Sequence, residues 1–185
     1  MSDKTTSFRD HFLIAMPKMQ DPNFEGTVTY ICDHNEHGAM GIVINRPMDM
    51  LLGEILAQLD FGGEKNEELV YAGGPVQMER GFVLHPPQGE WQSSLKISER
   101  ISLTTSRDIL EALAIEQGPS EHLVALGYAG WGAGQLEQEI VENCWLTCPS
   151  DERILFSVPF EKKFDAAISL LGFDPNQLSD QTGHA

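Results

Sequence analysis

An alternating segment followed by a tight turn constrains the fold of this chain more than any other feature of its sequence. Residues 27–34 (TVTYICDH) alternate in the manner of a β-strand, with one face expected to carry Val28, Tyr30, Cys32 and His34. Residues 35–38 (NEHG) end in glycine and predict a turn, and residues 39–46 (AMGIVINR) predict a second strand that Pro47 ends. These two strands are therefore predicted to pair as an antiparallel hairpin.

Apolar runs and helical spacings divide the rest of the chain into further elements. Short apolar runs predict strands at residues 11–16, 69–71, 81–85, 101–104, 123–126, 145–147 and 154–158. Apolar residues at helical spacing predict about four helices, over residues 51–59, 107–114, 136–141 and 160–171. Thr105 or Ser106 is expected to cap the second of these helices, and Gly172 to stop the last.

Strands and helices interleave along the chain, but the connections are irregular and a hairpin lies near the start. We therefore expect an α/β (α+β mixed) fold, with a mixed, mostly antiparallel sheet or a small barrel-like sheet flanked by about four helices. One domain is expected over residues 11–174, with flexible ends at residues 1–10 and 175–185.

The charge of the chain argues against some classes of partner. Twelve Lys and Arg residues face twenty-eight Asp and Glu residues, which gives a formal net charge of −16. Each phosphate contact to a nucleic acid needs a cation, so autonomous DNA binding is disfavoured. Anionic membrane surfaces are disfavoured for the same reason.

The cysteine count and the N-terminal segment indicate the cytoplasm. There are three cysteines, Cys32, Cys144 and Cys148, an odd number that predicts no disulfide framework. The apolar run at residues 12–16 is too short for a signal peptide, and no stretch approaches the ~20 apolar residues that span a bilayer. We expect no bound metal and no cofactor.

The glycine block at residues 127–134 has two interpretations. The block follows a predicted strand and opens a predicted helix, where backbone N–H groups can bind an anion. Its GxGxG spacing matches neither the dinucleotide fingerprint nor the P-loop, and Glu137 and Glu139 in the following turns would repel a phosphate. A tight chain reversal with close packing is therefore the favoured interpretation.

Several polar side chains could belong to a catalytic or metal site, but none of these sets is complete. Cys32 and His34, with His37 in the adjoining turn, could form an activated thiol or a metal site, or could be a buried thiol and two surface histidines. The hydroxyls at residues 104–106 have no nameable base, and helix capping explains them. Cys144 and Cys148 lack the CxxC redox spacing and are expected to be structural thiols.

Two arginines and two aromatic rings are candidates for a binding surface. Arg46 and Arg80 are predicted to lie at strand ends, where a guanidinium can bind a carboxylate through two hydrogen bonds. The carboxylate could belong to a ligand or to the protein itself, and we favour the protein. His85 precedes two prolines and is ambiguous. Trp131 in the glycine block could anchor a partner or pack the block onto the sheet.

Four blocks together resemble the AlgH/YqgE family of bacterial proteins. They are HFLIAMPKMQDPNF (11–24), TVTYICDHNEHGAMGIVINRP (27–47), GGPVQMERGFVLH (73–85) and LGYAGWGAGQLEQEIVENCWLTCP (126–149). LTTSRDIL (103–110) and GHA (183–185) fit as well, so the resemblance covers almost the whole chain. The family often carries an acidic residue after the Trp of the glycine block, where this chain has Gly132.

The resemblance implies a small cytosolic bacterial protein with a mixed α/β fold around a small barrel-like sheet. It also implies a proposed role in the transcriptional regulation of alginate synthesis, but no reaction, cofactor or catalytic residue. Our main hypothesis is a binding or interaction module with a regulatory role, whose partner is an unidentified protein or small molecule. The alternatives are an enzyme or small-molecule binder and a direct DNA-binding regulator.

The small-molecule alternative makes a geometric prediction. Its cleft would be built from the hairpin turn, the GGPV segment and the glycine block, and His34, Arg46, Arg80 and Trp131 would converge there. The residues expected to bind a ligand or partner are His34, Asn35, Arg46, Gly73, Gly74, Arg80, His85 and Trp131.

Overall fold

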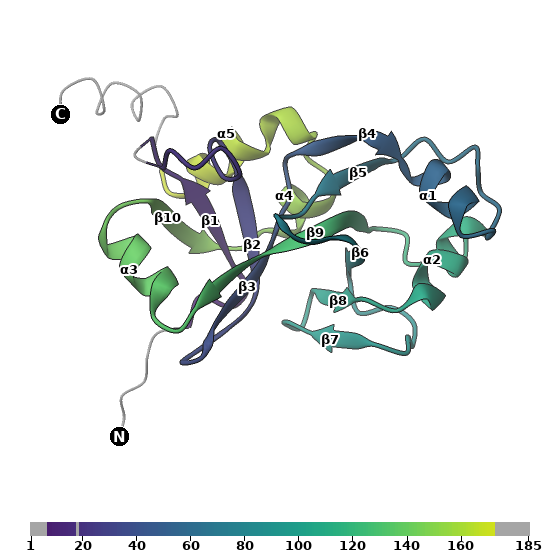
Figure 1. Cartoon of the computed structure of the whole chain (residues 1–185), viewed down its shortest axis with the longest axis horizontal. Coiled ribbons are helices and arrows are strands. Elements are labelled where there is room, and N and C mark those ends of the chain that lie inside the picture. The colour runs from purple at the N-terminus through teal and green to yellow at the C-terminus, as the bar shows by residue number, and fades with distance from the viewer. Residues whose placement is uncertain (1–6, 18, 173–185) are drawn as a thin grey trace.

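Strand β9 (Leu123–Gly132) is the strand around which the sheet of this protein is organised (Figure 1). The computed structural model describes residues 7–17 and 19–172. On one edge of β9, the parallel strand β5 (Leu69–Ala72) gives way to the antiparallel strand β3 (Gly38–Val43). Antiparallel β6 (Val76–His85) pairs along the other edge. Three separate segments of the chain thus meet on one strand.

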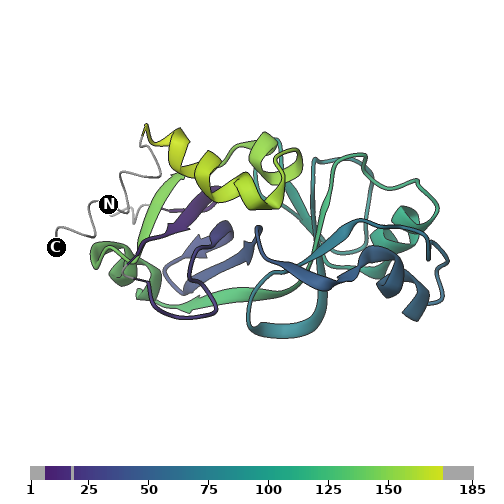
Figure 2. The same cartoon turned by 90° about the horizontal axis from the view of Figure 1, so that it is seen from above.

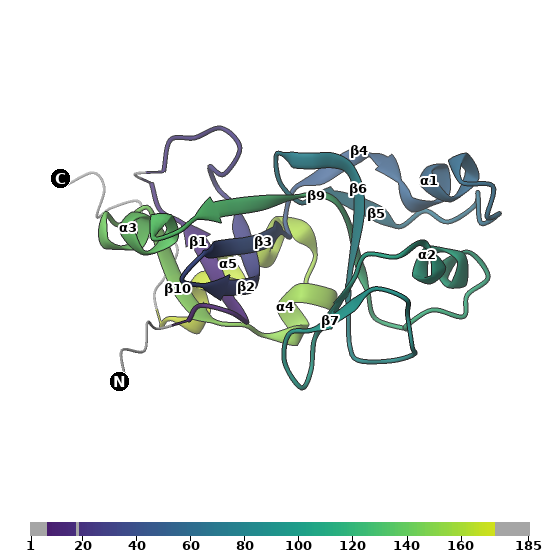
Figure 3. The same ribbon diagram turned by 60° about the horizontal axis from the view of Figure 1, so that its bottom comes forward.

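The other strands extend this sheet in both directions. They are β1 (His11–Ala15), β2 (Val28–Asn35), β4 (Pro47–Leu51), β7 (Ser94–Lys96), β8 (Ser102–Thr104) and β10 (Trp145–Pro149). The main order is β10-β1-β2-β3-β9-β6-β8-β7, and β4 pairs with β5. Only the β5–β9 pair is parallel among the described strands. The sheet curls, so that β1, β2, β3 and β10 form a half-barrel (Figure 3).

The helices lie at both ends of this sheet. They are α1 (Leu52–Gln58), α2 (Arg107–Ala114), α3 (Gln135–Val141), α4 (Glu152–Phe156) and α5 (Phe160–Leu170). Helices α4 and α5 cover the half-barrel, whereas α1 and α2 lie together at the far end (Figure 2). The predicted α/β single domain with a curled, mostly antiparallel sheet is confirmed. No helix within residues 7–17 and 19–172 is long and apolar enough to cross a lipid bilayer.

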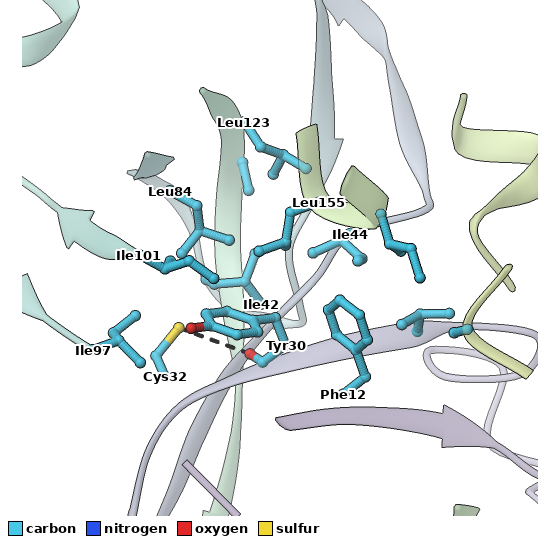
Figure 4. Packing of buried hydrophobic residues seen from close by; sticks show 14 of the residues in the cluster. Phe12, Tyr30, Cys32, Ile42, Ile44, Leu84, Ile97, Ile101, Leu123 and Leu155 are labelled. Atoms are coloured by element: carbon cyan, nitrogen blue, oxygen red, sulfur yellow. Dashed lines mark hydrogen bonds between the residues drawn. The ribbon is translucent and has the colours of Figure 1, made fainter. Parts of the chain in front are cut away.

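Three clusters of buried side chains hold the helices on the sheet. The largest fills the half-barrel below α5 and includes Phe12, Tyr30, Cys32, Ile42 and Leu84 (Figure 4). A second joins α1 and α2 to β6 and β9. The third lies under α3, where the Glu139 carboxylate accepts hydrogen bonds from the indole N–H groups of Trp131 and Trp145, each at 2.9 Å. Burying these apolar surfaces is the main stabilising contribution.

The predicted hairpin is confirmed as β2 and β3, but one face of it was predicted incorrectly. Ile31 pairs with Gly41 and Asp33 pairs with Met40, so Cys32 is an extra residue that forms a β-bulge. The bulge shifts the alternation by one position. Cys32 therefore points into the half-barrel cluster, whereas His34 lies on the opposite face, against Phe8 and α3.

Two predicted elements were wrong. Residues 154–158 do not form a strand, because Glu152–Phe156 forms helix α4, whose first turn is capped by the Asp151 carboxylate. A segment of five residues is too short for its apolar pattern to distinguish a strand from a helix. The capping bond to Asp151 favours the helix. The glycine block is not a turn either, since β9 continues through it to Gly132 and α3 begins only at Gln135.

Glycines are needed where β9 exchanges one neighbour for another. A Cβ atom at Gly73 would lie 2.4 Å from the Gly127 carbonyl oxygen, and one at Gly127 would lie 2.4 Å from the Gly74 carbonyl oxygen. At Gly74 a Cβ would lie 2.1 Å from the Tyr128 carbonyl carbon. Two backbones thus touch directly, which no other residue permits.

The predicted flexible ends fall mostly outside the described residues. Residues 1–6 and 175–185, which include the GHA segment, are among those that the structure does not describe. Residues 7–10 are described and make contacts. The Tyr30 hydroxyl donates to the Asp10 carboxylate at 2.7 Å, and the Arg9 guanidinium donates to the Lys96 carbonyl at 2.7 Å.

Gly74→Ala is expected to lower the free energy of unfolding by about 3 kcal/mol or more, because the methyl group must displace backbone rather than a side chain. Gly132→Ala is the matched control, since the nearest atom to its Cβ is the Gln135 side-chain oxygen at 3.9 Å. Its effect should stay within about 0.5 kcal/mol. Urea denaturation followed by circular dichroism measures both values, and equal losses would contradict the proposed backbone contact.

Thr29→Val is expected to be neutral or stabilising, by up to about 1 kcal/mol. Among the described residues, the Thr29 hydroxyl is the buried side-chain polar atom without a hydrogen-bond partner, so its removal costs no bond. The control is Thr27→Val on the same strand edge, which removes a 2.6 Å bond to the Phe24 carbonyl and should cost about 1 kcal/mol. The same denaturation measurement compares them, and the opposite ranking would show that Thr29 has a partner in solution.

Candidate functional site

His34 links the N-terminal segment to α3 and does not face solvent. Its side chain is buried, contrary to the interpretation as a surface residue. The Phe8 amide donates to Nδ1 at 2.8 Å, so Nδ1 carries no proton, and Nε2 donates to the Glu137 carboxylate at 3.0 Å. The Phe8 ring also stacks on the imidazole, with centroids 5.6 Å apart. Both ring nitrogens are engaged, which leaves neither for a ligand.

Cys32 is a buried thiol with no activating base beside it. It is fully buried, its Sγ donates to the Tyr30 carbonyl at 3.8 Å (Figure 4), and the bulge places it on the face opposite His34. Burial, with a smaller effect of the Asp33 charge, raises the pKa of the thiol. The protonated thiol is a poor nucleophile, so the thiol–imidazole hypothesis fails. In the described part of the chain, the fold gathers no group of three His, Cys, Asp or Glu side chains that could hold a metal ion.

The two candidate arginines have different surroundings. Arg46 donates to the backbone carbonyls of Pro22 at 2.7 Å and Glu25 at 2.5 Å, so its internal partner is backbone and not the expected carboxylate. Arg80 lies 3.4 Å from the Gln77 side-chain oxygen and 5.5 Å from the Phe82 ring centroid. The expected internal carboxylate is therefore absent at both positions in the described structure.

The remaining predicted residues divide between framework and surface. Gly73 and Gly74 belong to the backbone contact on β9, and Trp131 is 7% exposed, with its indole bound to Glu139. Asn35 stabilises the hairpin turn by accepting from the His37 amide at 2.7 Å. Trp131 thus packs against α3. It does not pack the glycine block onto the sheet, as the second interpretation had it, because the block is itself part of strand β9.

The four side chains that were predicted to converge do not. An open groove of about 660 Å³ beside the hairpin, here called the hairpin groove, is lined in part by Asn35, Arg80 and Trp131. His34 lies buried against Glu137, and Arg46 lies on the loop around residue 22. The cleft predicted from the sequence therefore keeps only part of its residues.

A second cavity lies between the helix pair α1–α2 and the sheet, and we call it the helix cleft. It has a volume of about 490 Å³. Its apolar lining comes from four segments of the chain and consists of Met50, Ile55, Leu59, Val83, Leu110 and Leu126. Arg80 borders both this cleft and the hairpin groove.

Arginines on the rim of the helix cleft lack acidic partners. Arg107 opens α2, and its guanidinium lies 5.4 Å from the Phe61 ring centroid. Within the described residues, neither Arg80 nor Arg107 forms an ion pair, whereas the arginines that pair with carboxylates are Arg9, Arg100 and Arg153. In a chain with a net charge of −16, two unneutralised cations at one cavity are an unusual concentration of positive charge.

His85 belongs to a hydrogen-bonded chain beside the helix cleft. Its Nδ1 contacts the Pro86 carbonyl at 2.5 Å, and since a carbonyl only accepts, Nδ1 carries the proton. Nε2 therefore accepts from the Thr104 hydroxyl at 2.7 Å, and Thr104 in turn accepts from Ser94 at 2.9 Å. Thr104 is fully buried, and this chain of hydrogen bonds joins β6, β8 and β7.

Sequence reasoning missed the helix cleft because no local pattern encodes it. Arg107 follows Ser106, which occupies the N-cap position without a side-chain capping bond, and it looks like an ordinary first-turn residue. The apolar residues of the cleft follow the helical and strand periodicities that also make the core. Only the three-dimensional arrangement separates the residues that line the cleft from those beneath it.

This chain is similar in sequence and in structure to known bacterial proteins. A family model described as AlgH-like matches residues 12–176. A UPF0301 protein of Hahella chejuensis is 59% identical over the full length of both chains, and one of Thioalkalivibrio sulfidiphilus is 56% identical over 98% of each. The solution structure of the AlgH protein from Pseudomonas aeruginosa is similar, with a TM-score of 0.81 and 49% identity over all of both chains. A crystal structure from Corynebacterium diphtheriae, at 20% identity and a TM-score of 0.67 over 89% of this chain and 86% of that one, shares the fold.

His85→Gln is expected to cost more stability at pH 8 than at pH 5. Burial is the largest effect on His85 and lowers the pKa of its imidazole in the folded protein. The neutral ring therefore stabilises the fold above the ordinary pKa, and this contribution is lost as pH falls through about 6.5 toward the folded pKa. Glutamine does not titrate, so the difference in unfolding free energy from wild type should narrow as pH falls.

Urea denaturation at pH 8, 6.5 and 5 measures this difference. The control is His37→Gln, at an exposed position of the hairpin turn, which should remain close to wild type throughout. A His85→Gln difference that stays constant or widens toward pH 5 would show that His85 is not held neutral.

Proposed function

The chain belongs to the AlgH-like family, and we propose that this member acts by reversible binding of a small amphipathic anion in the helix cleft. The ligand has an apolar body that fills the cleft and one carboxylate, phosphate or sulfate group at its rim. Binding of this kind gives the protein a regulatory role in the cytoplasm. The observation that carries the proposal is the pair of unneutralised arginines, Arg80 and Arg107, beside an apolar cavity.

The size and lining of the helix cleft suit a small molecule. Its volume of about 490 Å³ falls in the range of about 300–1,000 Å³ found for small-molecule sites. Such sites are lined mainly by apolar side chains, with a few polar groups that orient the ligand. Leu59 comes from the end of α1, Leu110 from α2 and Val83 from the sheet. An apolar chain or ring placed here leaves water at a gain of about 25 cal/mol per Å² of buried surface.

The arginines select the charge of the ligand. A guanidinium presents several N–H donors in one plane and binds carboxylate or phosphate oxygens in pairs. In the described structure Arg80 and Arg107 have only an amide oxygen and aromatic faces as partners, so binding an anion breaks no existing ion pair. Glu79 also borders the cleft, which disfavours ligands of high negative charge.

A regulatory role fits the position of the cleft. Helices α1 and α2 come from distant parts of the chain. They pack against each other at one end of the sheet. A ligand between them contacts both, so it stabilises one arrangement of the pair over others. The altered outer surface of α1 and α2 is then what a protein partner detects. Direct nucleic-acid binding is not part of the proposal, because the net charge of −16 opposes it.

Octanoate is expected to bind the wild-type protein, with heat detectable by isothermal titration calorimetry and chemical-shift changes at α1 and α2. Arg107→Gln and Arg80→Gln should each weaken binding by about tenfold, because a hydrogen bond to a charged group contributes about 1.5–3 kcal/mol. Octanol has the same apolar chain without the charge, so it should bind weakly to wild type and equally to the variants.

The control variant is Arg100→Gln, which removes a cation that pairs with Glu152 away from the cleft. Its affinity for octanoate should equal that of wild type. Loss of binding in Arg100→Gln would indicate a general charge effect. The proposal would be wrong if octanoate failed to bind at millimolar concentration or bound the two cleft variants as tightly as wild type.

A further inference from the structure

Lys163 is a lysine whose side chain is buried in the interior of the fold. It lies in α5 and is 2% exposed, and among the described residues no other Lys, Arg, Asp or Glu is buried to this degree. Lysine is almost never fully buried unless a charged partner accompanies it. Lys163 has no carboxylate partner within ion-pair distance in the described structure.

The contacts of Lys163 suit an uncharged amine. Nζ donates to the Ile44 carbonyl at 3.1 Å and to the Leu155 carbonyl at 3.0 Å, which uses both protons of a neutral amine. In the neutral amine the remaining position is a lone pair. The Tyr71 ring centroid lies 5.0 Å from Nζ, a contact that would favour the ammonium form and so acts against burial. Burial lowers the pKa of Lys163 to about 7, because the charged form loses its hydration without gaining a counter-ion.

Lys163 is one of the residues that line a cavity. Lys163, Tyr71 and Leu155 line it together with Glu68 and His122, and its volume is about 190 Å³. We call it the α5 cavity. It is separate from the helix cleft, with which it shares no lining residue. Its volume limits an occupant to a few non-hydrogen atoms.

A charged histidine lies in the same cavity. Both nitrogens of His122 face acceptors, the Pro119 carbonyl at 2.9 Å and the Glu68 carboxylate at 2.5 Å, so both carry protons. Burial alone would lower the pKa of His122, but the bonds to Glu68 and Pro119 outweigh it and raise the pKa. The His122 hydrogen bond, the largest effect, lowers the pKa of Glu68. Within the described residues, the cavity therefore contains an amine without a carboxylate partner and a histidine whose charge is already balanced by Glu68.

We propose that Lys163 is an amine nucleophile that captures a small aldehyde or ketone in the α5 cavity as an imine. The Nζ lone pair attacks the carbonyl carbon, and the carbon–oxygen double bond is replaced by a carbon–nitrogen double bond. The two Nζ protons and the carbonyl oxygen leave as water, and no electrons are gained or lost overall.

The groups around the α5 cavity favour a reactive Lys163 over one that only donates structural hydrogen bonds. Tyr71 from β5 remains neutral, because burial and then the Glu161 charge raise the pKa of its phenol. Glu68 is already paired with His122, so it does not neutralise an ammonium on Lys163. A desolvated lysine of this kind is the usual means by which proteins form imines near neutral pH.

Reductive trapping tests the proposal on the whole protein. The protein is incubated with acetaldehyde and sodium cyanoborohydride between pH 6 and 9, and peptide mass spectrometry follows labelling at each lysine. Lys163 should be labelled at least about tenfold faster than exposed Lys162 near pH 7.5, since an ordinary lysine has a pKa of about 10.4 and is almost entirely protonated there. Its rate should level off above pH 7, whereas that of Lys162 should rise throughout.

Variants separate reactivity from structure. Lys162→Met should leave labelling of Lys163 unchanged, and Lys163→Met should remove only the fast phase. The pH profile of wild type provides the answer even if Lys163→Met fails to fold. The proposal is overturned if Lys163 stays unlabelled while the exposed lysines react, or if its rate follows the pH dependence of Lys162. Because the α5 cavity shares no residue with the helix cleft, either result leaves octanoate binding untouched.

Discussion

The direct contact between two backbones at β9 determines how the rest of this structure is arranged. Gly73 and Gly74 approach Gly127 and Tyr128 so closely that no side chain fits between them. At this point β9 exchanges its parallel neighbour β5 for the antiparallel β3. One strand can therefore belong to the half-barrel at one end and support α1 and α2 at the other. Both proposed sites lie beside strands that this exchange brings together.

Because this chain is strongly acidic, a basic side chain that is buried or has no acidic partner is unusual in it. Most arginines are matched by carboxylates or carbonyls, as expected where acids outnumber bases twenty-eight to twelve. In the described structure Arg80 and Arg107 have no carboxylate or backbone carbonyl as a partner, Lys163 has two carbonyls but no carboxylate, and each of the three borders a cavity. A cation without a partner lowers the stability of the fold. Binding of a ligand in the cavity beside it can restore that stability. The two cavities differ in chemistry, because the arginines remain charged whereas burial lowers the pKa of the lysine to about 7.

Sequence patterns predicted the parts of the fold that depend on local periodicity. The alternation in residues 27–34 and the NEHG turn predicted the hairpin, and Ser106 predicted the start of α2. The bulge at Cys32 could not be read from alternation, because it depends on pairing across to Gly41 and Met40. The site was predicted less well, since its residues come from several segments that only the folded sheet brings together. Arg80 was identified, but no pattern in the sequence singled out Arg107 or Lys163.

A single carboxylate on α3 has a practical consequence for spectroscopy. Glu139 accepts both indole N–H groups of Trp131 and Trp145, and these are two of the three tryptophans in the chain. The third, Trp91, packs near His85 on the face that carries α1 and α2. The intrinsic fluorescence thus has two sources at opposite ends of the sheet, one sensitive to the attachment of α3 and one to events around the helix pair. Replacing Trp91 by phenylalanine would leave an emission that reports on α3 alone.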